Sequence, residues 1–338
     1  MPKKRIVYID FMKGVCILLV VVFHLDNDAY GVHTNEMLQS FRIPMYFFLS
    51  GLFFKTYNGF VDFSRRKVNN IIVPLVFFLL LSFLYIFVKE FLKSGFNFER
   101  IVLLLPANPI ENNVPLWFLV VLFEVNIIYY LLQKFLPRVA VIVAAILLSV
   151  VGYYFGLHGR YFYLYLDIAF VAMPFFILGA ETRRLGLLEK GPHIAVRLAM
   201  VVAVMVILYF FAQTINLYDR NYPSYLRLYV LPCMSILTLM FVCQYIKHPV
   251  PIISHCGRYS IMILGTHALM TGHIYAFFTS HLPSMVGTVW SYLIMLAVVI
   301  VLEYPIIYLL RKYAPRLTAQ KEFFRQGWKL KDVKGEIR

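Results

Sequence analysis

Charged residues are scarce in this chain. Only 14% of its 338 residues are Asp, Glu, Lys or Arg, whereas 61% are hydrophobic and the mean hydropathy is +0.74. A water-soluble protein of this length would have to expose much of that apolar surface, and soluble proteins rarely expose large apolar patches. The scarcity of charge therefore excludes an ordinary soluble domain and indicates an integral membrane protein.

Cysteine is also rare, and its positions exclude two further kinds of site. The chain has four cysteines, Cys16, Cys233, Cys243 and Cys256, which fall in or beside apolar runs without a paired spacing. This pattern predicts neither a disulfide framework nor a zinc site. The sequence also has no Walker A motif and no cluster of ligands with metal spacing, so we expect no metal.

Long apolar runs make up most of the sequence. About 20 apolar residues span a bilayer as a helix, in which every backbone polar group is paired. The runs do not alternate apolar and polar residues, as the strands of a membrane barrel do. They cover roughly residues 7–25, 41–54, 70–88, 115–133, 139–157, 164–180, 195–213, 226–246, 259–279 and 286–310.

These runs predict an all-α protein, a polytopic transmembrane helical bundle of about ten spans. The run at 41–54 is short and contains Pro44, so a turn or a re-entrant segment is an alternative there. Most connections are short and polar. Residues 1–310 are therefore expected to form a single transmembrane domain, and residues 311–338 a basic cytoplasmic tail.

Positively charged residues gather in alternate connections between the runs. If ten spans alternate from a cytoplasmic N-terminus, the inner segments hold 24 Lys and Arg residues and the outer segments hold 7. Cytoplasmic loops carry such an excess, so we predict a multi-pass protein of the cell (inner) membrane with both termini in the cytoplasm. Anionic membrane lipid then accounts for the formal net charge of +15, without a nucleic-acid partner.

The first apolar run contains three ionisable residues, Asp10, Lys13 and His24. At helical spacing they fall at roughly 0°, 300° and 320° around the axis, so they share one face. That face should look into the bundle or a wet cavity, because charges that face lipid are unfavourable. An i,i+3 pair that holds the helix near the cytoplasmic surface is the alternative for Asp10 and Lys13.

His24 lies roughly 16 Å from Lys13 along this helix, too far for the two to pair. A histidine near neutrality can accept and return a proton, which a hydroxyl acceptor needs before it attacks an acyl carbonyl. A buried histidine that bonds a neighbouring helix is the alternative. Asp26 or a carboxylate from another span would orient the imidazole, and the sequence does not choose between them.

Five stretches of the chain follow one another as a set of motifs. They are residues 8–14 followed by His24, residues 41–51, residues 115–119, residues 257–260 leading to His267, and residues 303–305. In this order they resemble the membrane acyltransferase-3 superfamily, especially its branch similar to fucose-4-O-acetylases and other cell-surface polysaccharide O-acetyltransferases. Each motif alone is weak, but five in order over nearly the whole chain are fairly specific.

The resemblance implies a catalytic role for His24 and makes Lys13 the counterpart of the family's first-span basic residue. Together with Asp10, these form the predicted catalytic set. The implied donor is an acyl-coenzyme A, usually acetyl-CoA, and the implied acceptor is a sugar hydroxyl on a surface glycan or its lipid-linked precursor.

Two positions depart from the family pattern. The family often has histidine where Arg42 stands, at a position tied to acceptor chemistry. The basic pair three residues apart in the family's first cytoplasmic loop corresponds here to Lys67 and Asn70. We therefore expect the donor phosphates to bind Arg65, Arg66 and Lys67.

The predicted substrate-binding residues are Arg42, Trp117, Glu124, His267 and Glu303. Ionisable groups inside apolar runs are functional candidates. Interhelical hydrogen bonding is the alternative role for Glu124 and Glu303.

Three classes of function are compatible with a membrane bundle of this kind. The first is an O-acyltransferase that uses His24 as base. The second is a transporter or flippase for a glycan or lipid carrier, but transporters often contain inverted repeats, and none is found here. The third, a scaffold without chemistry, does not explain three ionisable residues on one face of the first run.

Overall fold

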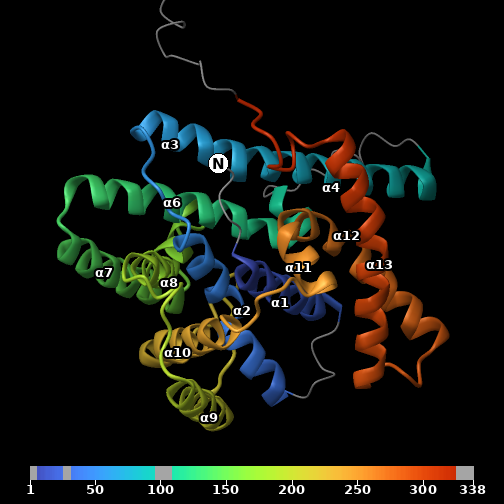
Figure 1. Cartoon of the computed structure of the whole chain (residues 1–338). Helices are drawn as coiled ribbons and strands as arrows, with labels where there is room; N and C mark the ends of the chain where they lie inside the picture. Colours follow the sequence, from blue (N-terminus) through green and yellow to red (C-terminus); the bar gives the residue numbers. More distant parts are fainter. Residues whose placement is uncertain (1–5, 26–31, 96–108, 325–338) are drawn as a thin grey trace, which may run out of the picture.

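The computed structural model describes residues 6–25, 32–95 and 109–324, and every structural statement below refers to this part of the chain. Its regular elements are helices, and its β-type pairing is limited to one bridge between Asn216 and Asn221. The predicted all-α, polytopic membrane protein is confirmed. Figure 1 shows α1 (Val7–Leu25) in the middle of the bundle, where it contacts α2, α10, α11, α12 and α13.

Nine stretches of the described chain are long and apolar enough to cross a membrane, judged by length and composition. They are α1; α3 (Phe60–Lys67) continued by a π-helical turn, η1 (Val68–Ile72), and α4 (Val73–Ser94); η2 (Pro109–Leu116) with α6 (Trp117–Phe135); α7 (Arg138–Leu157); η3 (Tyr163–Tyr165) with α8 (Leu166–Arg184); α9 (Ile194–Phe211); α10 (Tyr225–Cys243); α12 (Ser260–His281); and α13 (Val289–Tyr313). A shorter helix, α11 (Pro251–Arg258), packs against α1.

The predicted run at 41–54 belongs to α2 (Val32–Gly51), a helix of 20 residues that continues through Pro44. The structure thus has a continuous helix where a turn was the alternative. At about 30 Å, α2 is as long as the hydrocarbon core is thick. Its first half is polar, which explains why α2 is absent from the nine apolar stretches.

Two glycines bring the backbones of α2 and α8 together. A Cβ on Gly51 would lie 1.9 Å from the Phe176 carbonyl oxygen, and a Cβ on Gly179 would lie 2.0 Å from the Phe48 carbonyl oxygen. Membrane helices approach this closely where small residues line their interface. The contact holds α2 inside the bundle.

Both described ends of the chain lie at one end of the bundle. Near the start of α1, the backbone of Asp10 packs closely on Gly257 of α11. A Cβ on Gly257 would lie 1.8 Å from the Asp10 carbonyl oxygen. Near the end of α13, the Arg311 guanidinium lies 4.7 Å from the centre of the Tyr259 ring, two residues after Gly257. Two ends on the same side of the bundle fit an even number of crossings. The nine apolar stretches and α2 together make ten. The orientation in the membrane stays a prediction from the charges.

Candidate active site

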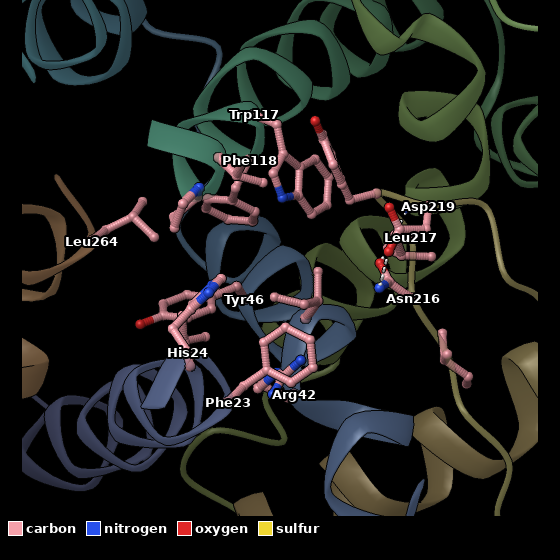
Figure 2. A pocket seen from close by; sticks show the side chains of 16 residues that line it. Phe23, His24, Arg42, Tyr46, Trp117, Phe118, Asn216, Leu217, Asp219 and Leu264 are labelled. Atoms are coloured by element: carbon pink, nitrogen blue, oxygen red, sulfur yellow. Dashed lines mark hydrogen bonds between the residues drawn. The ribbon is translucent and has the colours of Figure 1, made fainter. Parts of the chain in front are cut away.

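His24 lies in the last turn of α1 and lines a cavity of about 210 Å³, here named the His24 cavity. The walls come from α1, α2, the η2–α6 segment, α12 and the connection between α9 and α10. They include Arg42, Tyr46, Trp117, Phe118, Asn216 and Asp219 (Figure 2). The structure therefore brings three predicted residues, His24, Arg42 and Trp117, to one cavity from three helices.

His267 lies beside His24 but does not line this cavity. The centres of the two rings are 5.2 Å apart. His267 is fully buried, and its Nδ1 is 2.7 Å from the Ile263 carbonyl oxygen. A carbonyl only accepts, so Nδ1 is the donor and Nε2 is left as an acceptor. No partner for Nε2 is found in the described chain.

Arg42 of α2 is a buried cation, 7% exposed. Its guanidinium carbon lies 4.1 Å from the centre of the Phe23 ring, and its Nη1 donates to the Leu19 carbonyl at 3.3 Å. Its Nε has no hydrogen-bond partner among the described residues, which also offer Arg42 no carboxylate. Buried cations are normally paired. Arg42 therefore has donor capacity that the described chain does not use, and its side chain lines the cavity.

Trp117, at the start of α6, contributes an aromatic wall. Its ring centre lies 5.8 Å from that of Tyr218 in the α9–α10 connection and 6.3 Å from that of Phe118. The Tyr218 hydroxyl is half-buried, and this burial, followed by the neighbouring Tyr165, raises its pKa above the usual value. Tyr218 therefore remains a neutral hydroxyl group in the wall of the cavity.

A second cavity, of about 130 Å³, lies next to Lys13 and is here named the Lys13 cavity. It shares three wall residues with the His24 cavity: Tyr46, Phe118 and Leu264, here called the shared wall. The Lys13 ammonium lies 5.0 Å from the centre of the Phe53 ring. The two cavities therefore adjoin along α1, with Lys13 at one end and His24 at the other.

Asp10 is not brought to either of these cavities. It lines a third hollow of about 330 Å³, together with His255 and Arg258. Along α1, Asp10 is roughly 21 Å from His24. The three ionisable residues of the first run, predicted to share one face, thus line three separate hollows.

Glu124 and Glu303 also lie away from the His24 cavity. Glu303 is 2% exposed, and its two carboxyl oxygens accept from the Thr266 hydroxyl at 2.7 and 2.9 Å. This contact joins α12 to α13, as the interhelical alternative expects. Glu124 keeps one buried oxygen, Oε2, without a partner in the described chain. Substrate binding by either residue stays a prediction.

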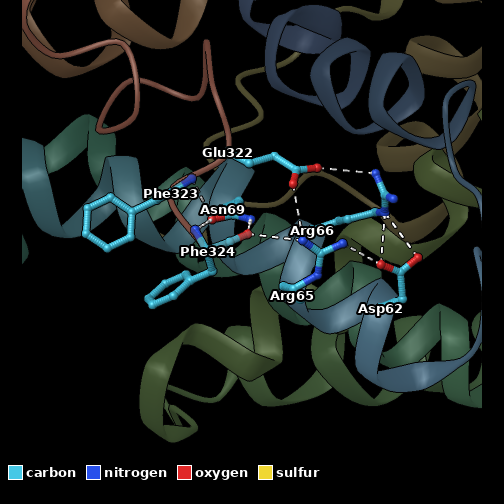
Figure 3. Close-up of polar contacts among 7 residues, drawn as sticks. All are labelled: Asp62, Arg65, Arg66, Asn69, Glu322, Phe323 and Phe324. Carbon is cyan, nitrogen blue, oxygen red and sulfur yellow. Dashed lines mark hydrogen bonds and ion pairs between the residues drawn. The ribbon is translucent and has the colours of Figure 1, made fainter. Parts of the chain in front are cut away.

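Arg65, Arg66 and Lys67, here called the Arg65–Lys67 cluster, end α3. Asp62 pairs with Arg65 at 2.6 Å and with Arg66 at 3.2 Å. Glu322, in the segment after α13, pairs with the same two arginines at 3.2 and 3.5 Å (Figure 3). Both predicted phosphate-binding arginines therefore already contact carboxylates of this chain.

Hydrogen bonds, as well as ion pairs, hold the segment after α13 on α3 and η1. The Asn69 Oδ1 accepts from the backbone nitrogens of Phe323 and Phe324, at 3.1 and 2.8 Å. The Asn69 Nδ2 donates to the Phe324 carbonyl at 3.0 Å. Lys67 points elsewhere, with its ammonium 5.4 Å from the centre of the Phe63 ring. Residues 322–324 thus cover part of the predicted donor site.

Sequence reasoning missed four residues that line the cavity: Tyr46, Asn216, Tyr218 and Asp219. Three of them lie in the polar stretch between two apolar runs, at 214–225, and that polarity was the available signal. Asp26, considered as the carboxylate that orients His24, lies outside the described residues.

Comparison with known families adds one finding. A family model described as an acyltransferase domain matches residues 6–308, a range that contains every predicted site residue. No curated protein and no solved structure matches the chain.

Proposed function

Because the chain belongs to the acyltransferase-3 superfamily of membrane acyltransferases, we propose that it transfers an acetyl group from acetyl-CoA to a hydroxyl of a cell-surface carbohydrate or its lipid-linked precursor. The reaction takes place in the cell (inner) membrane, within surrounding lipid. The observation that carries the proposal is His24, a base that lines a cavity within a bundle of apolar helices. The motifs that resemble fucose-4-O-acetylases support the sugar acceptor.

His24 is the proposed general base. Its neutral imidazole takes the proton of the acceptor hydroxyl as the hydroxyl oxygen attacks the thioester carbonyl carbon. The attack leaves negative charge on the former carbonyl oxygen. Arg42, a buried cation that lines the same cavity, is suited to stabilise this oxygen. Such fixed donors act strongly where bulk water is excluded.

Collapse of the tetrahedral intermediate completes the transfer. The carbon–sulfur bond breaks, its electron pair leaves with the sulfur, and the His24 imidazolium returns its proton to the thiolate. The products are an ester on the acceptor and free coenzyme A. His267, whose ring lies against that of His24, restricts the orientation of the base.

The acyl donor approaches His24 from the other end of α1. The Lys13 and His24 cavities have the shared wall in common, which supports the proposal that an acyl-pantetheine arm extends roughly 16 Å along the helix from one cavity to the other. The Arg65–Lys67 cluster is the proposed site for the donor phosphates, because guanidinium groups bind phosphate oxygens bidentately.

Purified protein in lipid nanodiscs and radiolabelled acetyl-CoA test the proposed reaction. Wild type should release or transfer labelled acetyl, whereas His24→Gln should lose this activity. His281→Gln is the matched control, since His281 is an exposed histidine at the same end of the bundle and does not line the cavity. Retention of more than about a third of wild-type turnover by His24→Gln would make His24 structural. No turnover of the donor by wild type would favour transport.

A further inference from the structure

The connection between α9 and α10 closes one side of the His24 cavity and has a defined shape. Asn216 and Asn221 exchange backbone hydrogen bonds at 3.1 and 3.0 Å, which closes a tight turn between them. Ile215 and Leu217 are buried, at 2% and 1% exposed. The connection is thus anchored in the core on both sides of Asn216.

A buried ion pair fixes this turn to α8. The Arg220 guanidinium donates from Nε to Asp167 Oδ2 at 2.8 Å and from Nη2 to Asp167 Oδ1 at 3.2 Å. Its Nη1 donates to the Tyr218 carbonyl at 2.9 Å. Asp167 is fully buried and lies in the first turn of α8, where the helix dipole favours a carboxylate. Burial opposes the charge of Arg220, but Asp167 outweighs it and raises the pKa of Arg220.

The backbone of Arg220 is also strained. Its φ is 55°, in the left-handed region that non-glycine residues rarely adopt. Strain of this kind persists where the surroundings fix the residue, and it clusters at ligand-binding sites. The Asp167 pair and the nearby Tyr161 ring, 4.4 Å from the guanidinium carbon, supply that fixation.

The turn presents two polar side chains to the cavity, across from His24 in Figure 2. The Asn216 Nδ2 donates to Asp219 Oδ2 at 2.6 Å, and the Asn216 Oδ1 accepts from the Asp219 backbone nitrogen at 3.2 Å. Asp219 is exposed, and its other oxygen, Oδ1, makes no hydrogen bond within the described chain. The contacts with Asn216 hold this carboxylate, which lines the same cavity as the base.

Aromatic and polar groups thus meet at the same cavity. The rings of Trp117 and Tyr218 form an apolar wall with their centres 5.8 Å apart. A sugar ring has apolar C–H faces, which match aromatic walls, and hydroxyl groups around its edge, which match a carboxylate and an amide. Pockets with mostly aromatic walls and a few placed polar groups bind small ligands in one orientation.

We propose that Asn216 and Asp219 are the specificity residues that bind the acceptor and that the Arg220–Asp167 pair holds them in place. The acceptor is a sugar ring without a charged group on the side that contacts Asp219. The inference rests on the proposed acyl transfer. The Asp219 carboxylate accepts hydrogen bonds from two neighbouring hydroxyl groups of the ring and repels phosphate or carboxylate groups. At about 210 Å³, the cavity is smaller than the roughly 300–1,000 Å³ typical of ligand pockets, so it holds one ring.

Kinetics with two varied substrates test this assignment. The probes are acetyl-CoA and a panel of 4-nitrophenyl hexopyranosides, with protein in lipid nanodiscs. Asp219→Asn and Asn216→Ala should each raise the acceptor KM about ten-fold or more, because a hydrogen bond to a charged group contributes about 1.5–3 kcal/mol. The donor KM and the hydrolysis of acetyl-CoA without acceptor should stay within about two-fold of wild type, as expected for a loss of acceptor contacts alone.

Asn221→Ala is the matched control, since Asn221 is an exposed residue of the same turn that bonds through its backbone and does not line the cavity. An unchanged acceptor KM in both variants, with His24→Gln inactive, would overturn the inference and leave the proposed function standing. If no glycoside of the panel gives saturation kinetics while acetyl-CoA is still hydrolysed, the sugar assignment is overturned. Full activity of His24→Gln would instead overturn the proposed function.

Discussion

The His24 cavity and the Arg65–Lys67 cluster are both predicted to bind charged or polar groups of the substrates. They differ in whether their own polar atoms already have hydrogen-bond or ion-pair partners. At the His24 cavity, Arg42 has a buried Nε without a partner in the described chain, and so has His267 at its Nε2, next to His24. In the cluster, Arg65 and Arg66 each contact two carboxylates.

An unpaired buried polar group costs about 1–3 kcal/mol, so each such group is a candidate for a ligand contact. Paired cations near the membrane surface contribute less and also serve as topological anchors. The difference therefore favours the cavity as the place of chemistry and gives the cluster a secondary, electrostatic role. Five experiments test this difference.

The largest effect expected is an all-or-none difference in labelling. Phe60→Cys at the start of α3 should react with an impermeant thiol reagent only after the cells are opened, whereas Ser284→Cys between α12 and α13 should react from outside. Both positions are exposed, and Cys16 and the other native cysteines are buried or half-buried. Labelling of Phe60→Cys in intact cells would reverse the predicted orientation.

Removal of the base is expected to have the largest catalytic effect. His24→Ala should lower kcat by about 10²–10⁴, the usual contribution of a general base. Expression and membrane insertion should be unaffected. Added imidazole should restore part of the rate, because the truncated side chain leaves space at the His24 cavity. A variant that keeps its rate would show that the cavity works without this histidine.

Arg42→Gln should lower kcat by about 10²–10³, as expected when a donor to a developing oxyanion is lost. Arg42→Lys keeps the charge without the planar fork and should fall between this variant and wild type. Arg227→Gln is the control, because Arg227 lies over the Phe211 ring and does not line the cavity. Equal rates in Arg42→Gln and wild type would remove Arg42 from the mechanism.

Substitutions in the cluster should act on donor binding. Arg65→Gln combined with Arg66→Gln should raise the KM for acetyl-CoA about three- to ten-fold, because two phosphate contacts are weakened, and should lower kcat less than the His24 variants do. The acceptor KM should not change. An equally charged control is Arg311→Gln with Lys312→Gln, at the end of α13. An unchanged donor KM, with orientation verified, would make the cluster only an anchor.

The smallest effect is expected from the carboxylate that pairs with the cluster. Glu322→Gln removes one negative charge beside Arg65 and Arg66, so the KM for acetyl-CoA should fall about two-fold, since exposed ion pairs contribute little. Glu189→Gln, in the exposed connection after α8, is the control. A higher donor KM in Glu322→Gln would mean that Glu322 supports the donor site instead of competing with phosphate.

The sequence predicted the membrane bundle because each span depends on its own composition. An apolar run of sufficient length becomes a helix whatever its neighbours are, and nine stretches of the described chain meet that condition. The polar first half of α2 shows where the rule fails. Its second half packs closely on α8 at Gly51 and Gly179, and hydropathy does not report such contacts.

The sequence alone also identified His24, as a titratable group in an apolar run and through motifs of a known family. The packing of the helices determines which of the other predicted residues join it, and it adds Asp219. Arg42, Trp117 and Asp219 are far apart in the chain and meet where α2, α6 and the α9–α10 turn pack around the end of α1. Asp10, on the same arc of α1 as Lys13, faces a different hollow. Helical periodicity fixes the face of a residue, whereas packing of neighbouring helices fixes what that face meets.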